Sequence, residues 1–159
     1  MSDISEQLQE QVMDARREKQ PLRIVGGGSK SFMGREISGD SLNVSGHTGI
    51  VSYEPVELVL TVRAGTSLIE IEAALAENNQ VLAFEPPRFS DSATIGGTLA
   101  CNQSGPSRPW CGSVRDHVLG TRVINGLGEH LKFGGQVMKN VAGYDVSRLQ
   151  AGAMGTLGL

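Results

Sequence analysis

The chain has 159 residues, of which 39% are hydrophobic and 19% are charged, and its formal net charge is −3. This length is sufficient for one domain with its own hydrophobic core. The slight acidic balance gives no basic field for nucleic acid or anionic lipid, and no non-polar run approaches the ~20 residues of a membrane span. The first residues lack the basic and non-polar regions of a secretory signal, so a cytoplasmic location is expected.

Residues 3–19 have the spacing of an amphipathic helix, and Pro21 ends it. Residues 22–25 then predict a short strand that runs into three consecutive glycines. Residues 58–62, LVLTV, form a continuous non-polar run and predict a buried strand.

A second helix is expected after that strand, because Ser67 and Glu70 have the spacing of a capping box. Residues 81–84 predict another short strand. This alternation of helices and strands indicates a small α/β lobe over about residues 1–85.

The second lobe, about residues 86–159, is richer in loops. We expect a short helix at 95–101, preceded by the possible cap residues Ser90, Asp91 and Ser92. Residues 118–124 predict a strand, residues 125–129, NGLGE, a hairpin turn, and residues 131–133 the returning strand. Residues 142–149 predict a last short helix. The predicted fold class is α+β, with the two lobes divided near Pro86.

The glycine stretch RIVGGGSKSF fits neither common nucleotide motif. A Walker A loop requires Gly before the Lys, and Ser29 precedes Lys30; a Rossmann fingerprint requires Gly at position 31, which is Ser31. Consecutive glycines after a strand still expose backbone N–H groups that can bind an anion, although such a loop can also be an ordinary surface turn.

Two further glycine clusters, ATIGGT at 93–98 and GAMGTLGL at 152–159, favour the ligand interpretation. The first is expected to open a helix with outward N–H groups at its positive end. Three clusters suit a long ligand with a diphosphate and two ring systems better than a single phosphate. Cys101 and Cys111 match no zinc or iron–sulfur spacing, so no metal site is expected and both are expected to be reduced thiols.

Six segments in this order carry a family resemblance: RIVGGGSKSF, LTVRAGTSLIEIEAAL, ATIGGTLACNQSGPSR, GSVRDHVLGTRVINGLGE, KNVAGYDVSRL and GAMGTLGL. Together they resemble the FAD-binding domain of flavoproteins of the vanillyl-alcohol oxidase and p-cresol methylhydroxylase (PCMH) type. Within that superfamily they are most similar to the FAD-binding E subunits of bacterial glycolate oxidases. The resemblance covers nearly the whole chain and implies a two-lobed FAD-binding PCMH-type domain.

The resemblance implies cofactor-binding roles by position. The loop for the FAD diphosphate would comprise Gly26, Gly27, Gly28, Ser29 and Lys30. The diphosphate and flavin ring would also be lined by Thr94, Ile95, Gly96, Gly97, Asn102, Ser104 and Gly105. The ribityl and adenosine parts would lie near Gly112, Asp116, Val118, Gly155, Thr156 and Leu159.

Two departures from the family pattern matter. Many relatives bond the flavin through a His in the glycine loop, and this loop has none, so non-covalent FAD is expected. His47, His117 and His130 match no linkage position and are expected to be structural or surface residues. Relatives also continue into a second domain that covers the flavin; that substrate domain is absent here, so we expect a fragment or a truncated product holding the cofactor half.

The implied chemistry is oxidation of glycolate, a 2-hydroxy acid, to glyoxylate, with electrons passing through FAD to an iron–sulfur subunit. The implied partners are a sister flavin subunit and that iron–sulfur subunit, which could hold the chain at the inner membrane. The catalytic base is unknown, and Arg88, Arg108 and Arg115 are candidates for binding a substrate carboxylate. Two alternatives stay open: a non-catalytic assembly subunit, and the FAD domain of another 2-hydroxy-acid dehydrogenase.

Overall fold

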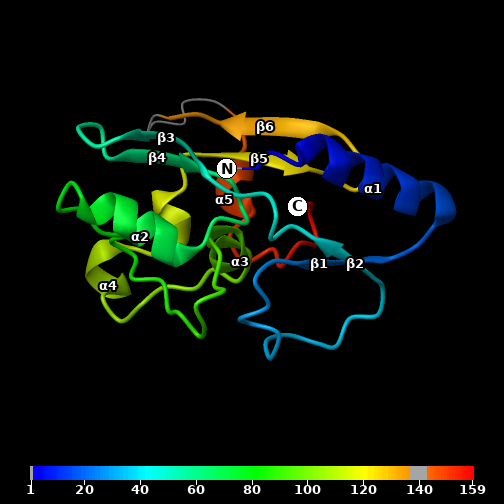
Figure 1. The fold of residues 1–159 in the computed structure, drawn as a ribbon, viewed down its shortest axis with the longest axis horizontal. Coiled ribbons are helices and arrows are strands. Elements are labelled where there is room, and N and C mark those ends of the chain that lie inside the picture. Colours follow the sequence, from blue (N-terminus) through cyan, green and yellow to red (C-terminus); the bar gives the residue numbers. More distant parts are fainter. Residues whose placement is uncertain (1, 137–142) are drawn as a thin grey trace.

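A computed structural model describes residues 2–136 and 143–159. Its helices are α1 (Ser5–Glu18), α2 (Leu68–Ala76), α3 (Ile95–Ala100), α4 (Arg108–Cys111) and α5 (Val146–Leu149), with a 3-10 turn, η1, at Val114–His117. Its strands are β1 (Leu22–Val25), β2 (Asp40–Asn43), β3 (Ile50–Glu54), β4 (Val59–Val62), β5 (Gly120–Ile124) and β6 (His130–Gly134) (Figure 1).

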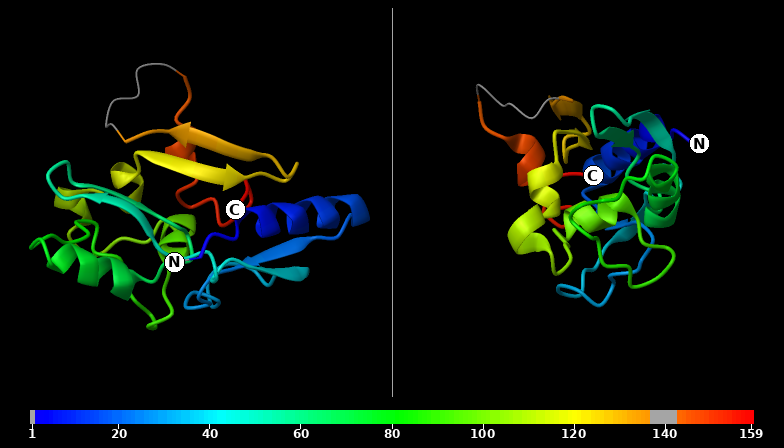
Figure 2. Two further views of the ribbon diagram at one scale, coloured as in Figure 1. Left: turned by 45° about the horizontal axis from the view of Figure 1, so that its top comes forward. Right: turned by 90° about the vertical axis from the view of Figure 1, so that its left-hand side faces the viewer.

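Helix α1 forms the main core contact at one end of the molecule. Its buried face carries Leu8, Val12 and Ala15, at the helical spacing that the sequence predicts. The helix ends where Lys19 adopts a left-handed conformation and Gln20 N–H donates to the Ala15 carbonyl, 2.8 Å away. Figure 2 shows α1 between the β1–β2 pair and the β5–β6 hairpin. Leu42 and Ile124 from those two layers complete the buried cluster.

The strands form three separate two-stranded sheets within the described residues. β1 and β2 are parallel, whereas β3–β4 and β5–β6 are antiparallel hairpins. The parallel pair requires a long connection, residues 26–39, and this connection contains the glycine loop. The β5–β6 turn is the predicted one: Asn125 N–H donates to the Glu129 carbonyl, and Asn125 Oδ1 accepts from the amides of Leu127 and Glu129.

One predicted strand is wrong. Residues 81–84 form no strand, because Glu85 N–H donates to the Leu82 carbonyl and closes a turn, with Glu85 at φ +45°. Phe84 is buried in that turn, so the non-polar residue that suggested a strand packs into the core instead of pairing in a β-sheet. Sequence reasoning also missed β2 and β3.

The helix predicted at 142–149 is shorter in the structure: α5 begins only at Val146, because Asp145 is its N-cap and accepts from the Arg148 amide. Residue 142 and the first residues of the KNVAGYD motif lie outside the described residues. Among the helices of the described ranges, none is long and non-polar enough to cross a membrane.

Candidate functional site

The glycine loop follows directly from β1. Ser31 N–H donates to the Gly28 carbonyl and Met33 N–H to the Lys30 carbonyl, so the chain turns back at once. Gly28 has φ +70°, a conformation that favours glycine. Within the described part of the chain, the amides of Gly27, Gly28, Ser29 and Lys30 donate to no protein acceptor. Adjacent amides without partners around a left-handed residue form an anion-binding concavity.

A second loop, the residues just before α3, packs directly on the glycine loop. A Cβ atom at Gly27 would lie 1.5 Å from the Ser92 carbonyl oxygen, and one at Gly26 would lie 3.0 Å from Thr94 Oγ1. Ser92 Oγ donates a 2.6 Å hydrogen bond to the Gly27 carbonyl. The first two predicted glycine clusters therefore form one wall.

The backbone amides at the start of α3 are hydrogen-bonded within the protein rather than free for a ligand. Ile95 N–H donates to the Thr66 carbonyl (3.0 Å) and Gly96 N–H to the Ala64 carbonyl (2.9 Å), while Gly97 N–H donates to Thr94 Oγ1 (3.2 Å). The prediction that these N–H groups point outward is therefore wrong, because the amides of Ile95 and Gly96 bond α3 to the segment before α2.

The cap of α3 is also corrected. Thr94 is the N-cap residue, whereas the expected cap residues Ser90, Asp91 and Ser92 lie in the preceding loop. Gly96 is required for packing, since a Cβ there would lie 2.7 Å from Ala64 Cβ. Of the two hydrogen bonds of the predicted capping box at α2, the one in which Ser67 Oγ accepts from the Glu70 amide is present.

Lys30 points away from water. Its Nζ atom is enclosed and has no hydrogen-bond partner among the described residues. Burial lowers the pKa of this ammonium, and the neighbouring Cys101 thiol acts in the opposite direction. A buried ammonium without a hydrogen-bond partner is energetically costly, which sets Lys30 apart from the other residues of this loop.

The segment after α3 is held from several sides. Ser104 Oγ accepts from the Val114 amide at 2.9 Å, which ties this segment to η1. Gly105 packs on Glu85, where a Cβ would lie 2.5 Å from Glu85 Cβ, and Glu85 Oε2 accepts from the Ser107 amide at 3.0 Å. These bonds from Ser107 lower the pKa of the Glu85 carboxyl. Asn102, at φ +49°, touches the last cluster through Gly152.

The remaining predicted residues surround this arrangement. Gly112 packs on Asp116, whose carboxylate accepts from the backbone and hydroxyl of Ser113; these bonds lower the pKa of Asp116. Val118 follows η1 and is half-buried.

The last cluster returns to β1. A Cβ at Gly155 would lie 2.8 Å from Ile24 Cδ1. Thr156 Oγ1 donates to the Ala153 carbonyl. Leu159 packs against the core cluster, and its amide and carbonyl both bond to Ile124 on β5. The structure thus brings the three clusters together around α3 and β1, with Leu159 in the core rather than beside the glycine loop.

Two of the three histidines contact backbone groups, and His130 is exposed. His47 Nδ1 accepts from the Ile4 amide (3.3 Å), and His117 Nε2 lies 2.9 Å from the Cys111 carbonyl. Arg88 is paired with Glu72 at 3.2 Å. Over the described ranges no group of three or more potential metal-binding side chains gathers.

Comparison with known proteins decides the family. A sequence model described as "FAD binding domain" matches residues 4–134. The chain belongs to this family. The family match confirms the expected α+β FAD-binding PCMH-type domain, and a solved structure, alkyldihydroxyacetonephosphate synthase, shares its fold. That structure superposes with a TM-score of 0.74 over 97% of this chain and 30% of its own, at 22% identity.

Two curated relatives of the chain are subunits of glycolate oxidases. "Glycolate oxidase subunit GlcE" from Escherichia coli (strain K12) is 57% identical over 157 residues, which cover 99% of this chain and 45% of that protein. "Glycolate oxidase subunit GlcD" from Bacillus subtilis (strain 168) is 34% identical over 69% of this chain and 23% of its own. The chain therefore spans less than half the length of either relative.

The residues present fit the diphosphate of FAD. The unpaired backbone amides of the glycine loop are donors of the kind that such an anion requires. Sequence reasoning considered Ser92 only as a helix cap and did not single out Glu85, yet these two residues hold the loops around this site. Both contacts join segments far apart in the chain, and no spacing in the sequence signals them.

Proposed function

We propose that the chain is the FAD-binding part of a GlcE-like subunit in a glycolate-oxidising complex, and that it holds FAD without a covalent bond. The observation that carries the proposal is the set of unpaired amides at Gly27, Gly28, Ser29 and Lys30 in a member of an FAD-binding family. The identity of 57% to GlcE supports the assignment to glycolate among the 2-hydroxy acids.

In this proposal each group of residues has one task. The loop of residues 26–30 binds the diphosphate. Residues 94–97 with Asn102, Ser104 and Gly105 line the diphosphate and the flavin ring; the amides at the start of α3 serve this role by fixing the helix, since they are already bonded. The ribityl and adenosine parts lie toward Gly112, Asp116, Val118, Gly155, Thr156 and Leu159.

The non-covalent mode is supported by the side chains near the loop. Residues 26–30 contain no His, Cys or Tyr to bond a flavin carbon. His47 and His117 are both engaged with backbone groups elsewhere. Cys101 lies near Lys30, but burial raises the pKa of its thiol and so disfavours the reactive thiolate.

Bound flavin would supply the electron acceptor for oxidation of the carbon that carries the substrate hydroxyl. The chain's own residues would bind, orient and shield this group. Arg88, Arg108 and Arg115 remain candidates for the substrate carboxylate, and Arg88 would first have to leave Glu72. No described side chain is assigned as the catalytic base.

The proposed partners are a GlcD-like flavin subunit and an iron–sulfur subunit that receives the electrons. The similarity to both GlcE and GlcD supports the first partner. A cytoplasmic location, with attachment to the inner membrane through these subunits, belongs to the same proposal. Two free cysteines, Cys101 and Cys111, fit a reducing compartment.

Flavin content tests the proposal directly. The purified chain is expected to bind one equivalent of added FAD. The flavin absorption band should remain with the protein after free FAD is removed by dialysis, and acid should release all of the flavin. Co-expression with GlcD-like and iron–sulfur subunits is expected to give glycolate-dependent reduction of an electron acceptor. A chain that joins the complex without taking up FAD would instead support an assembly role. A complex that oxidises D-lactate or another 2-hydroxy acid in preference to glycolate would reject the substrate assignment.

A further inference from the structure

Two serines in the loop before α3 form a directed pair of hydrogen bonds that ends on the glycine loop. Ser92 Oγ donates to the Gly27 carbonyl at 2.6 Å, and the Ser90 and Ser92 hydroxyls are 2.7 Å apart. A serine hydroxyl has one proton. Because Ser92 gives its proton to Gly27, Ser90 must be the donor in the second bond.

The acceptor of this pair shares a peptide group with one of the unpaired amides. No peptide bond among the described residues is cis, so the Gly27 carbonyl and the Gly28 N–H belong to one planar trans unit and point in opposite directions. Holding the carbonyl toward Ser92 therefore turns the Gly28 N–H away from Ser92. A hydrogen bond to the carbonyl also polarises the same unit and makes its N–H a better donor.

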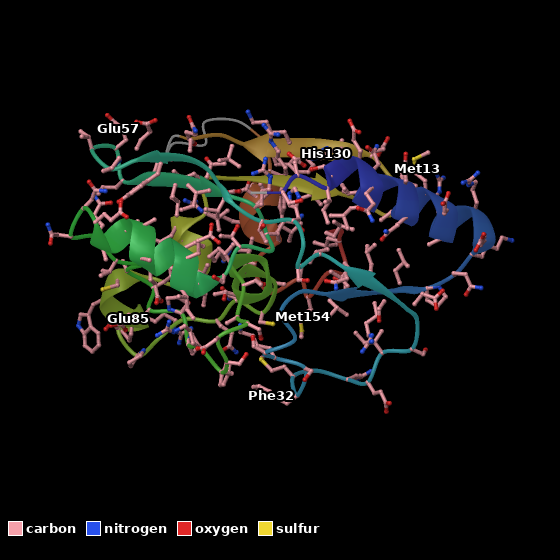
Figure 3. All side chains as sticks on the ribbon, in the orientation of Figure 1. Met13, Phe32, Glu57, Glu85, His130 and Met154 are labelled. Carbon is pink, nitrogen blue, oxygen red and sulfur yellow. The ribbon has the colours of Figure 1, made fainter. Side chains whose placement is uncertain are left out.

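The two loops are in close backbone contact at this point. The Gly27 Cα lies so close to the Ser92 backbone that a Cβ would be 1.5 Å from the Ser92 carbonyl oxygen. On the outer side the same two loops meet again, where the Phe32 and Phe89 rings pack edge to face at 5.1 Å between centroids. Figure 3 shows Phe32 at the edge of the molecule, on the β1–β2 connection. Two independent ties thus join segments some sixty residues apart.

We propose that Ser92, supported by Ser90, is a positioning residue that fixes the Gly27–Gly28 peptide so that the Gly28 N–H is presented to the FAD diphosphate. This inference rests on the proposed function for the identity of the ligand. Ser92 itself touches no ligand; it acts through the peptide. Its side chain is exposed, so the hydroxyl contributes little to folding and its loss affects mainly the orientation of this amide.

A matched pair of variants isolates the hydroxyl. Thr and Val have nearly the same shape, so Ser92→Thr keeps the donor and Ser92→Val removes it. FAD affinity is measured by flavin fluorescence on the full 159-residue chain. We expect Ser92→Thr to bind within about twofold of wild type, and Ser92→Val to bind about five- to tenfold more weakly, the usual effect of one hydrogen bond. Ser90→Ala is expected to lie between them, and all three proteins should have the wild-type melting temperature.

The free protein provides a second readout that does not depend on FAD. The ¹H–¹⁵N resonance of Gly28 should shift in Ser92→Val and stay close to wild type in Ser92→Thr. Equal FAD affinities for the Thr and Val variants, with an unmoved Gly28 resonance, would overturn the inference. If wild type binds no FAD, the proposed function fails, and the Gly28 resonance in the two variants alone decides whether Ser92 orients this peptide.

Discussion

Replacing Gly27 by alanine is expected to separate the two loops that form the candidate site. The added Cβ would lie 1.5 Å from the Ser92 carbonyl oxygen and 2.6 Å from its carbon, and both are backbone atoms that no rotamer change can move. To reach ordinary contact the loops must part by about 2 Å. Overpacking of this kind typically costs about 1–3 kcal/mol. Because both loops are partly exposed and can yield, we expect about 1–2 kcal/mol of lost stability.

FAD binding should be affected more strongly than stability. The parted loops misdirect the Gly28 amide, and we expect at least a tenfold loss of FAD affinity, equivalent to about 1.4 kcal/mol. Urea unfolding and a fluorescence titration measure the two effects. Gly126→Ala is the matched control, since its Cβ meets nothing within 4 Å and its backbone is not left-handed. A Gly27→Ala protein with the urea midpoint and FAD affinity of Gly126→Ala would refute the packing of these loops.

Three further outcomes are expected. Gly105→Ala, whose Cβ would lie 2.5 Å from Glu85 Cβ, should lower the free energy of unfolding by about 1–3 kcal/mol in urea, and a neutral result would reject that contact. Burial lowers the pKa of His47 below its usual value near 6.5, so the unfolded chain binds the proton more readily and stability should fall as pH drops from 7.5 to 5.5. His47→Gln should flatten that slope in urea titrations at each pH, and an unchanged slope would show that other groups cause it. Flavin bound to the protein should leave completely on acid precipitation, and a fluorescent protein band on a denaturing gel would reveal a covalent link.

The elements that the sequence predicts well are those stabilised by local signals. Helix α1 follows from its non-polar face and its stop before Pro21, and the β5–β6 hairpin follows from the turn at Asn125. Strand β1 is likewise predicted, because its short non-polar run lies between Pro21 and the three glycines that end it.

The errors share one physical origin, which is contact between distant segments. Strand β2 has the polar sequence DSLN and exists because β1 pairs with it in parallel. Residues 81–84 look like a strand but turn, since Phe84 packs inward and Gly105 lies against Glu85. The amides of α3 resemble a free helix end in the sequence, yet Ala64 and Thr66 occupy two of them. A local sequence pattern cannot indicate whether a backbone amide will bond to a distant segment of the protein or to a ligand.

We propose that the glycine loop, rather than the start of α3, supplies the amides that bind the FAD diphosphate. Titrating FAD into the ¹⁵N-labelled chain and following backbone amide resonances tests this claim most directly. We expect large downfield shifts for the amides of Gly27, Gly28, Ser29 and Lys30, with little change in the bonded amides of Ile95 and Gly96. Binding of FAD that moves Ile95 and Gly96 strongly and leaves the glycine loop unchanged would contradict it.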